Sequence, residues 1–337
     1  IVQISADRKE INLVSIPRDS LVDVPQCETS KGTIPAQYNV MFNSIFAGAY
    51  KTGGDLSSAA SCTLNAVNSL TGLNIQNFIA GLVKMIDSVG GVDLCIPQNV
   101  NDPYTGLNLD KGMHHLDGVA ATQYARIRHG IGDGSDTSRT TRQQYLIKQL
   151  MSEALSKNLF TDTAQLYQLA KSALKSLNIS QGMADTAALA GLAMSLKNFT
   201  MTNLQTQTVP VVPAPSDPNR SVWTDEADNL WEKMRAGKPI FDTADSNSGD
   251  SSDTSSDNSA SSDDSGTTDS NQSDTTAETP DPVTGLITKS DGTLVDPSTG
   301  GTVDPDDGSI HDATTGQYIG LADRYLNATV CAVPAKN

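Results

Sequence analysis

The sequence predicts an α/β protein: a three-layer α/β/α domain with a central mixed sheet, then a disordered acidic linker and a small tail rich in β-hairpins. Strand-type and helix-type segments alternate over residues 1–240, which is typical of helices packed on both faces of a sheet. Residues 241–280 are almost wholly polar and acidic. Residues 281–337 repeat a short turn-forming motif. The chain is therefore predicted to consist of three regions: the domain, the linker and the tail.

The first elements follow from alternation and from helical spacing. Residues 1–5 and 10–16 alternate apolar and polar side chains around a short turn, which predicts a hairpin whose second strand ends just before Arg18. In open α/β sheets, ligands bind at that edge. Residues 26–37 are polar and are expected to form a loop. Apolar residues at helical spacing predict a helix over residues 55–70.

The middle and the end of the domain continue the alternation. Residues 78–89 fit a helix or a short strand followed by a helix, and residues 92–96 fit a buried strand. The remaining expected elements are a short helix over 116–123, a strand over 124–128, helices over 136–157, 161–178 and 182–197, a strand over 206–212 and a helix over 224–236.

Residues 242–280 cannot form a packed core. They contain ten acidic residues and no lysine or arginine, with mostly Ser, Thr, Asn and Gly between them. Such a segment buries too little apolar surface to offset the entropy of ordering, so we expect it to be disordered. It supplies ten of the sixteen net negative charges. The rest of the chain is therefore only mildly acidic, but it has no extended basic face, so nucleic-acid binding is not expected.

The tail repeats Asp-x-x-Thr-Gly. Copies begin at residues 281, 296 and 312, and Asp-Gly pairs at 291–292 and 307–308 lie between them. Asp-Gly and Thr-Gly between short β-prone segments predict successive hairpin turns. So few copies do not make a calcium-binding solenoid, and we expect a small β appendage.

The four cysteines show no CxxC or CxxH spacing, which disfavours a zinc site. They are either reduced core residues or two disulfides, and the acidic Ser/Thr linker suits an exported protein, which favours disulfides. We expect Cys27 to pair with Cys62, because both flank one excursion from the sheet, and Cys95 with Cys331 by exclusion. Three pairings are possible, and the sequence does not choose among them.

Four of the nine arginines lie within residues 126–142 of this acidic chain. Arg126 and Arg128 are two residues apart, so on a strand they share one face, together with Tyr124. The guanidinium group bonds phosphate in a bidentate manner and stays charged at physiological pH. This density therefore predicts a site for a phosphate-bearing ligand.

The helix that follows carries the other half of the arginine cluster. Arg139, Arg142 and Gln143 lie at i, i+3 and i+4 near its N-terminus, which itself attracts anions. Two arginines from the strand and two from the helix would then converge on one anion. The alternative is a surface salt-bridge network with Asp133 and Asp136.

No apolar run reaches the length of about 18 residues that a membrane-spanning helix needs. The chain opens without Met and inside a strand, so we interpret it as a fragment that lacks its N-terminal portion. The missing anchor in this segment therefore says nothing about the full gene product.

Four motifs occur in a characteristic order: Ser15-Ile-Pro-Arg-Asp-Ser20, Asp87-Ser-Val-Gly-Gly-Val-Asp93, Leu116-Asp-Gly118, and Tyr124-Ala-Arg-Ile-Arg128 followed by Asp-x-x-Arg-x-x-Arg-Gln-Gln. With them, residues 1 to about 240 resemble the LytR–CpsA–Psr family of membrane-anchored envelope enzymes. The loop-inserted form with cysteines resembles its actinobacterial branch. The resemblance implies a phosphotransferase that moves a glycopolymer from a polyprenyl-pyrophosphate carrier onto peptidoglycan through a phosphodiester bond, with Mg²⁺ at the pyrophosphate.

The resemblance also assigns residues and a location. Arg126, Arg128 and Asp136 are the expected catalytic residues, and the expected phosphate-binding residues are Arg18, Arg126, Arg128, Arg139, Arg142 and Gln143. The main metal ligands are expected upstream of Ile1. The expected location is the extracellular face of the cell membrane, within the envelope of a Gram-positive, actinobacterial cell.

Two features depart from the family pattern. The family's first strand, which carries an acidic residue and an arginine, would lie upstream of Ile1. Members also place a lysine before an Asn-x-Ala-Tyr/Phe segment, whereas residues 41–46 read Met-Phe-Asn-Ser-Ile-Phe without one. Lys31 and Lys51 are the candidates to replace it.

Two other functions would use the same arginines. One is a non-catalytic envelope scaffold or regulator that binds polyprenyl phosphates, and the other is a lipid-pyrophosphate phosphatase. Turnover of a lipid-pyrophosphate substrate separates an enzyme from a scaffold. Polymer joined to peptidoglycan separates a transferase from a phosphatase. The identity of the polymer stays open.

Overall fold

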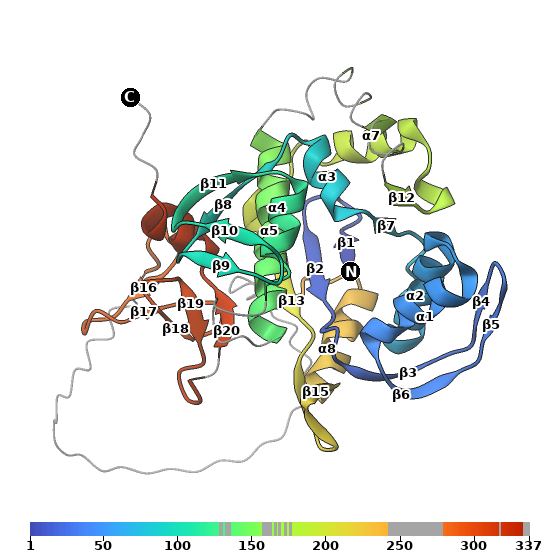
Figure 1. Ribbon diagram of the computed structural model, residues 1–337. Coiled ribbons are helices and arrows are strands. Elements are labelled where there is room, and N and C mark those ends of the chain that lie inside the picture. The colour runs from blue at the N-terminus through green and yellow to red at the C-terminus, as the bar shows by residue number, and fades with distance from the viewer. Residues whose placement is uncertain are drawn as a thin grey trace, which may run out of the picture.

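The computed structural model describes residues 1–127, 131, 136–156, 164, 167, 170, 171, 174, 177–241, 279–316 and 318–332, and of Asp136 and Thr137 only the backbone. Figure 1 shows an α/β domain with the C-terminal appendage packed beside α5. The domain strands are β1 (Val2–Ile4), β2 (Ile11–Ser15), β3 (Leu21–Val24), β4 (Cys27–Thr29), β5 (Gly32–Ile34), β6 (Gln37–Met41), β7 (Ile79–Ala80), β8 (Val92–Ile96), β9 (Val100–Asp102), β10 (Leu107–Leu109), β11 (Gly112–Leu116), β12 (Asn178–Ile179), β13 (Leu204–Thr208), β14 (Val211–Ala214) and β15 (Asp217–Trp223). The helices are α1 (Phe42–Gly53), α2 (Leu56–Thr71), α3 (Leu82–Ser88), α4 (Gly118–Tyr124), α5 (Asp136–Ser156), α7 (Thr186–Ser195) and α8 (Asp225–Arg235).

The central strand β2 carries helices on both of its faces. It pairs antiparallel with β1 and parallel with β13, so the sheet is mixed. Ile11 and Leu13 pack toward residues of α5, whereas Val14 packs with Trp231 of α8. Successive side chains of a strand point to opposite faces, so this division confirms the three-layer α/β/α arrangement.

Most of the expected elements are present where local signals are strong. Residues 1–15 form the expected hairpin. Helix α2 begins after Asp55, whose side chain accepts from the Ser58 N–H at 2.7 Å, and it ends at Gly72 with a φ of 66°. Both are standard helix-terminating features. Residues 79–88 form a strand followed by a helix, which was one of the two alternatives.

Other expectations were wrong or incomplete. Residues 27–34 form a hairpin, β4–β5, instead of a polar loop, and α1 was not anticipated. The expected strand over 206–212 is two strands, because Pro210 has no N–H to continue a ladder. The helix expected over 182–197 is shorter, with Asp185 capping α7. Most of the helix expected over 161–178 and residues 242–278 of the linker lie outside the described residues.

The structure contains both expected disulfides. Cys27 of β4 is bonded to Cys62 of α2, and Cys95 of β8 is bonded to Cys331 near the end of the described chain. The first joins the β4–β5 hairpin to the helix behind it. The second spans 236 residues of sequence and joins the appendage to the α/β domain.

The appendage is the hairpin-rich unit that the turn motifs predicted. Its strands form one antiparallel sheet in sequence order: β16 (Ile287–Thr288), β17 (Leu294–Val295), β18 (Thr302–Val303), β19 (Ser309–His311) and β20 (Tyr318–Leu321). A short helix, α9 (Asp323–Tyr325), and a π-helical turn over 326–330 follow. Leu326 is fully buried in the core that α5 and β8 form, so the appendage shares a core with the domain.

Candidate functional site

Arg18 lies just beyond the C-terminal end of β2, where the sequence placed it. Its Nε donates to Asp19 Oδ1 at 3.3 Å, and the Arg18 side chain is 52% exposed. Asn43, in the first turn of α1, donates from Nδ2 to the same oxygen at 3.1 Å. The Asn43 N–H also donates to the Arg18 carbonyl at 3.0 Å. This network orients Asp19 toward Arg18 and leaves much of the guanidinium accessible to a ligand.

The third turn of α5 lies at the same edge of the sheet as Arg18. Ser15, the last residue of β2, pairs with Thr208, the last residue of β13. Gln144 of α5 donates from Nε2 to Thr208 Oγ1 at 3.1 Å. The N-terminal part of α5 and the segment that follows β2 therefore meet at the carboxyl end of two parallel strands, a common place for ligands in α/β folds.

The arginine strand expected over 124–128 is not a strand in its described part. Asp117 caps α4, which continues to Tyr124, and the Arg126 N–H donates to the Gln123 carbonyl at 2.9 Å. Tyr124 is therefore buried together with Ala125 and Ile127, and only Arg126 is exposed. A helical turn replaces the two-residue alternation, so Tyr124 and Arg126 do not share a face. Arg128 lies outside the described residues.

Two side chains of α5 reach back to this turn. Arg142 donates from Nη2 to the Ile127 carbonyl at 2.5 Å and from Nη1 to Ser138 Oγ at 2.8 Å. Gln143 donates from Nε2 to the Ala125 carbonyl at 3.2 Å. Arg142 is only 3% exposed, whereas Gln143 is exposed. Arg142 and Gln143 thus hold the segment that bears Arg126 against the beginning of α5.

The other two predicted residues of α5 lie in its first two turns. Arg139 is buried, at 4% exposure. Asp136 is the first residue of the helix, and its side chain is not among those described. The structure therefore brings Arg142 and Gln143 to the segment of Arg126 and places Arg18 at the same edge of the sheet. Their role in binding phosphate remains a prediction.

Residues of the appendage also border this region. A cavity of about 20 Å³ lies between α5 and the appendage, and its walls include Tyr124, Ser138, Arg142, Ser309 and Tyr318. Burial raises the pKa of Tyr124 to about 12, and the nearby positive charge of Arg142 offsets only part of that rise. The predicted Cys95–Cys331 pair ties the C-terminal segment to the domain, but the sequence does not predict that Ser309 and Tyr318 border this cavity. Asn43 belongs to residues 41–46, the segment that corresponds in the sequence to the family's Asn-x-Ala-Tyr/Phe segment.

Neither candidate lysine lies near Asn43. Lys51 is in the last turn of α1, and the Lys31 ammonium lies beside Gly54, where an added Cβ would meet it at 2.7 Å. Along the axis of α1, the backbone of Lys51 lies about 12 Å from Asn43 and that of Gly54 about 16 Å. Lys31 and Lys51 therefore do not replace the family's lysine next to Asn43.

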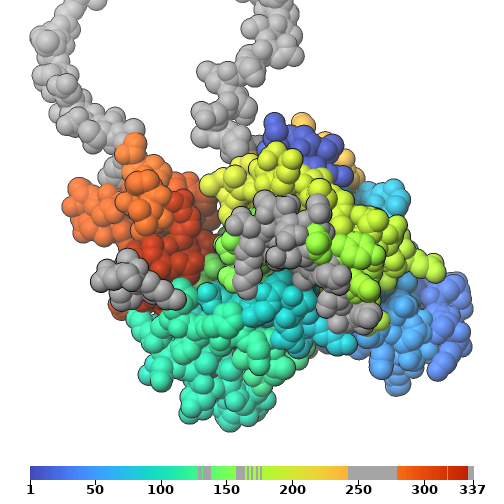
Figure 2. Space-filling view, turned by 90° about the horizontal axis from the view of Figure 1, so that it is seen from above, coloured from blue at the N-terminus to red at the C-terminus, as the bar shows by residue number. Residues whose placement is uncertain are grey.

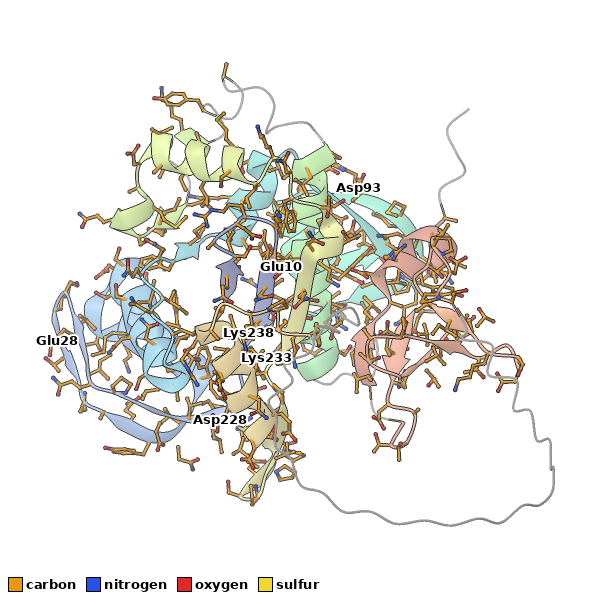
Figure 3. The ribbon with its side chains drawn as sticks, turned by 180° about the vertical axis from the view of Figure 1, so that it is seen from behind. Glu10, Glu28, Asp93, Asp228, Lys233 and Lys238 are labelled. Carbon is orange, nitrogen blue, oxygen red and sulfur yellow. A yellow bond between two sulfur atoms is a disulfide. The ribbon has the colours of Figure 1, made fainter. Side chains whose placement is uncertain are left out.

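The described residues contain no group of three or more His, Cys, Asp or Glu side chains arranged to hold a metal ion. Figure 3 shows how far apart acidic residues lie, with Glu28 on the β4–β5 hairpin at one side and Asp93 on β8 toward the other. In the same part of the chain, no helix is both long and apolar enough to cross a bilayer.

Comparison with known proteins extends over the α/β domain. The sequence model of the LytR_cpsA_psr family matches residues 1–236. The cell wall biosynthesis protein LcpA of Corynebacterium glutamicum is 28% identical over 222 residues, which are 63% of this chain and 42% of LcpA. The polyisoprenyl-teichoic acid–peptidoglycan teichoic acid transferase TagV of Bacillus subtilis is 26% identical over 246 residues, which are 70% of this chain and 56% of TagV. The chain thus spans about half the length of these curated relatives.

The fold comparison agrees with the family match. The crystal structure of B. subtilis TagV superimposes with a TM-score of 0.53 and 20% sequence identity, covering 71% of this chain and 88% of that one. At this identity the similarity establishes the fold alone. The appendage, residues 279–332, lies beyond the part that the family model matches.

Proposed function

The chain belongs to the LytR_cpsA_psr family, and on that premise we propose that it transfers a glycopolymer from a polyprenyl-pyrophosphate carrier onto peptidoglycan. The product is a phosphodiester between polymer and peptidoglycan. The names of its relatives support this class of reaction, since LcpA is a cell wall biosynthesis protein and TagV a teichoic acid transferase acting between a polyisoprenyl carrier and peptidoglycan. The polymer that this chain transfers is not specified by those names.

The observation that carries the proposal is the junction of α5 with the turn that bears Arg126. Arg142 and Gln143 fix that turn through its carbonyl oxygens, and Arg126 projects from it into solvent. Arg18 approaches the same edge of the sheet from β2. We assign Arg18, Arg126, Arg128, Arg139, Arg142 and Gln143 to the phosphates of the substrate, and Arg142 and Gln143 also hold the turn that bears Arg126.

These residues suit phosphoryl transfer, which requires positioning and neutralisation of charge more than covalent chemistry by the protein. An acceptor hydroxyl of peptidoglycan forms a bond to the phosphorus that bears the polymer. The bond from that phosphorus to the bridging oxygen breaks, and polyprenyl phosphate leaves with the bridging oxygen. The hydroxyl proton passes to a base, for which Asp136 at the start of α5 is the proposed group.

Mg²⁺ bound at the pyrophosphate would add positive charge next to the leaving group. The described residues assemble no set of carboxylates for it at this edge of the sheet. We therefore assign no metal ligand among the described residues. The proposed place of action is the outer face of the cell membrane, where both the lipid carrier and peptidoglycan are accessible.

The test is turnover of a polyprenyl-pyrophosphate-linked oligosaccharide by the oxidised full chain, with and without Mg²⁺ and with peptidoglycan as acceptor. Release of polyprenyl phosphate together with sugar joined to peptidoglycan is the expected result. Free phosphorylated sugar with none joined to the acceptor would indicate a phosphatase. Binding without turnover would indicate a scaffold.

Arg126→Gln provides the residue-level test, because Arg126 is exposed and its loss should leave the fold intact. The matched control is Arg8→Gln, in the β1–β2 turn at the opposite end of β2. Arg126→Gln should weaken binding of a short polyprenyl pyrophosphate at least tenfold. Equal affinities of the two variants would refute the assignment of Arg126 to the phosphate site.

A further inference from the structure

A cleft lined by Pro97 and six polar or charged residues lies between the α/β domain and the appendage. Its volume is about 370 Å³, within the range of roughly 300–1,000 Å³ that small-molecule sites occupy. Gln98, Asn99 and Lys111 line it from the domain, beside the β8–β11 pair, and Asp304, Asp306 and Asp307 line it from the appendage. Figure 2 shows the appendage, in orange and red, against the blue-green residues of the domain. Most of these side chains are exposed or half-buried, so the cleft is open to ligands.

The two walls of the cleft are fixed relative to each other. The Cys95–Cys331 disulfide joins them, and Leu326 of the appendage is fully buried in the core of the domain. The Ala322 N–H donates to the Gly308 carbonyl at 2.8 Å, which ties the turn over 304–308 to the segment leading to Leu326. The Lys111 ammonium donates to the Asp306 carbonyl at 3.4 Å across the cleft. A ligand would therefore meet a preformed site.

The turn that faces the cleft departs from its own repeat. Residues 281–285, 296–300, 304–308 and 312–316 form the same turn, each with the glycine N–H donating to the carbonyl of the first Asp and a glycine φ of 69–75°. In three of them the fourth residue is Thr, whose N–H and hydroxyl both donate to that Asp side chain. In the turn over 304–308 the third and fourth residues are Asp306 and Asp307.

Asp307 stands where the other three turns have Thr. The turn over 304–308 therefore lacks the stabilising hydroxyl donor and carries additional negative charge next to Asp304. Proteins break a local structural rule most often where function requires it. Only the turn with the two additional carboxylates lines the cleft, whereas the three regular turns contribute no residue to its wall. The carboxylates thus occur where a ligand would meet them.

We propose that this cleft is a saccharide subsite, which takes a neutral or amino-sugar unit of the proposed transfer reaction and therefore depends on the proposed function. Sugar hydroxyls donate to carboxylates and accept from carboxamide and ammonium groups, and the cleft offers all three. Three carboxylates against one ammonium group disfavour a phosphate-rich chain. The cleft shares Pro97, Gln98 and Asp307 with the small cavity at Arg142, so a bound sugar would lie next to the proposed phosphate site.

The test measures sugar binding to the oxidised full chain by calorimetry, apart from any turnover. The probes are triacetylchitotriose, which has the acetamido sugars of a peptidoglycan strand, and cellotriose, which lacks them. The variant Asp306→Ser/Asp307→Thr installs the residues of the turn over 296–300, so it should keep its melting temperature. It should bind the preferred sugar at least fivefold more weakly. Ser298→Ala, in the regular turn, is the matched control and should bind as the unmodified chain does.

The outcomes are distinct from those of the proposed function. Preference for triacetylchitotriose assigns the cleft to the peptidoglycan acceptor, and equal or better binding of cellotriose assigns it to the transferred polymer. Absence of binding by both sugars overturns the subsite, and so does unchanged binding by the double variant. Binding of polyprenyl pyrophosphate by the same protein preparation is measured separately, and its failure would count against the proposed function instead.

Discussion

The hydroxyl of Tyr145 donates a 2.7 Å hydrogen bond to Asn327 Oδ1, which lies 182 residues further along the chain. The same hydroxyl accepts a 3.0 Å hydrogen bond from the N–H of Cys95, the residue bonded to Cys331. Tyr145 belongs to α5, the helix that also carries Arg139 and Arg142. The appendage is therefore attached directly to the helix that shapes the candidate phosphate site.

Tyr145→Phe is expected to lower the free energy of unfolding by about 1–3 kcal/mol, because the Cys95 N–H would lose its acceptor inside the core. Urea denaturation of the oxidised chain measures this change. The control is Tyr50→Phe, at a side chain that is 49% exposed, which should change stability by less than about 0.5 kcal/mol. Equal stabilities of the two variants would show that the Tyr145 hydroxyl does not stabilise the junction.

Removal of the Cys95–Cys331 disulfide should destabilise the chain more than removal of Cys27–Cys62. The first closes 236 residues and the second 35, and the loop-entropy relation gives about 5.5 against about 3.8 kcal/mol. The comparison requires the double variants Cys95→Ser/Cys331→Ser and Cys27→Ser/Cys62→Ser, each in denaturant. A larger loss for the shorter loop would mean that packing, and not loop closure, decides the contribution.

Substitution of Arg126 and substitution of Arg142 should affect the stability of the fold differently. Arg126→Gln should change the free energy of unfolding by less than about 0.5 kcal/mol, because the side chain is exposed. Arg142→Gln should cost about 2–4 kcal/mol, because it removes buried charged donors from Ile127 and Ser138. Urea denaturation of both variants distinguishes the two roles. A stable Arg142→Gln variant would contradict the structural role assigned to that residue.

His115 gives the chain a pH-dependent contribution to stability. Its hydrogen bond to Asp93, 2.6 Å long, raises the pKa of His115 above its ordinary value, and the Gly90 carbonyl adds to the effect. The stabilisation is therefore fully present below the ordinary pKa of about 6.5, and it is lost as pH rises through the raised pKa. Asp93→Asn should lower the His115 pKa in an NMR titration. Asp110→Asn, the control, should leave it unchanged.

Two glycines of the appendage separate backbone strain from steric contact. Gly308 and Gly292 have φ of 69° and 86°, so alanine at either position costs about 1 kcal/mol of conformational strain. A Cβ at Gly308 would also meet Leu326 Cγ at 2.9 Å, whereas one at Gly292 meets nothing within 4 Å. Gly308→Ala should therefore lower the free energy of unfolding, measured by urea denaturation, by at least about twice as much as Gly292→Ala does. Equal losses would mean that the turn does not press against Leu326.

The sequence predicted those elements whose signals are local. Helix α2 has an Asp cap and a terminal glycine, α5 has an apolar stripe after a capping region, and the appendage has a glycine at every turn. Each of these signals acts over a few residues, so neighbours in sequence suffice to specify the element. The motifs around Arg18 and Arg142 likewise sufficed to identify the family.

Only the tertiary structure decided how the arginines are used. Their spacing predicted that Tyr124 and Arg126 share one face of a strand. In the structure α4 continues to Tyr124, so Tyr124 is buried and Arg126 is exposed. Arg142 is buried because its partner, the Ile127 carbonyl, arrives from a different element. The appendage also joins α5 through the hydrogen bond from Tyr145 to Asn327, which lies 182 residues away. Burial and long-range contacts depend on how elements pack together, and no local pattern of residues specifies that packing.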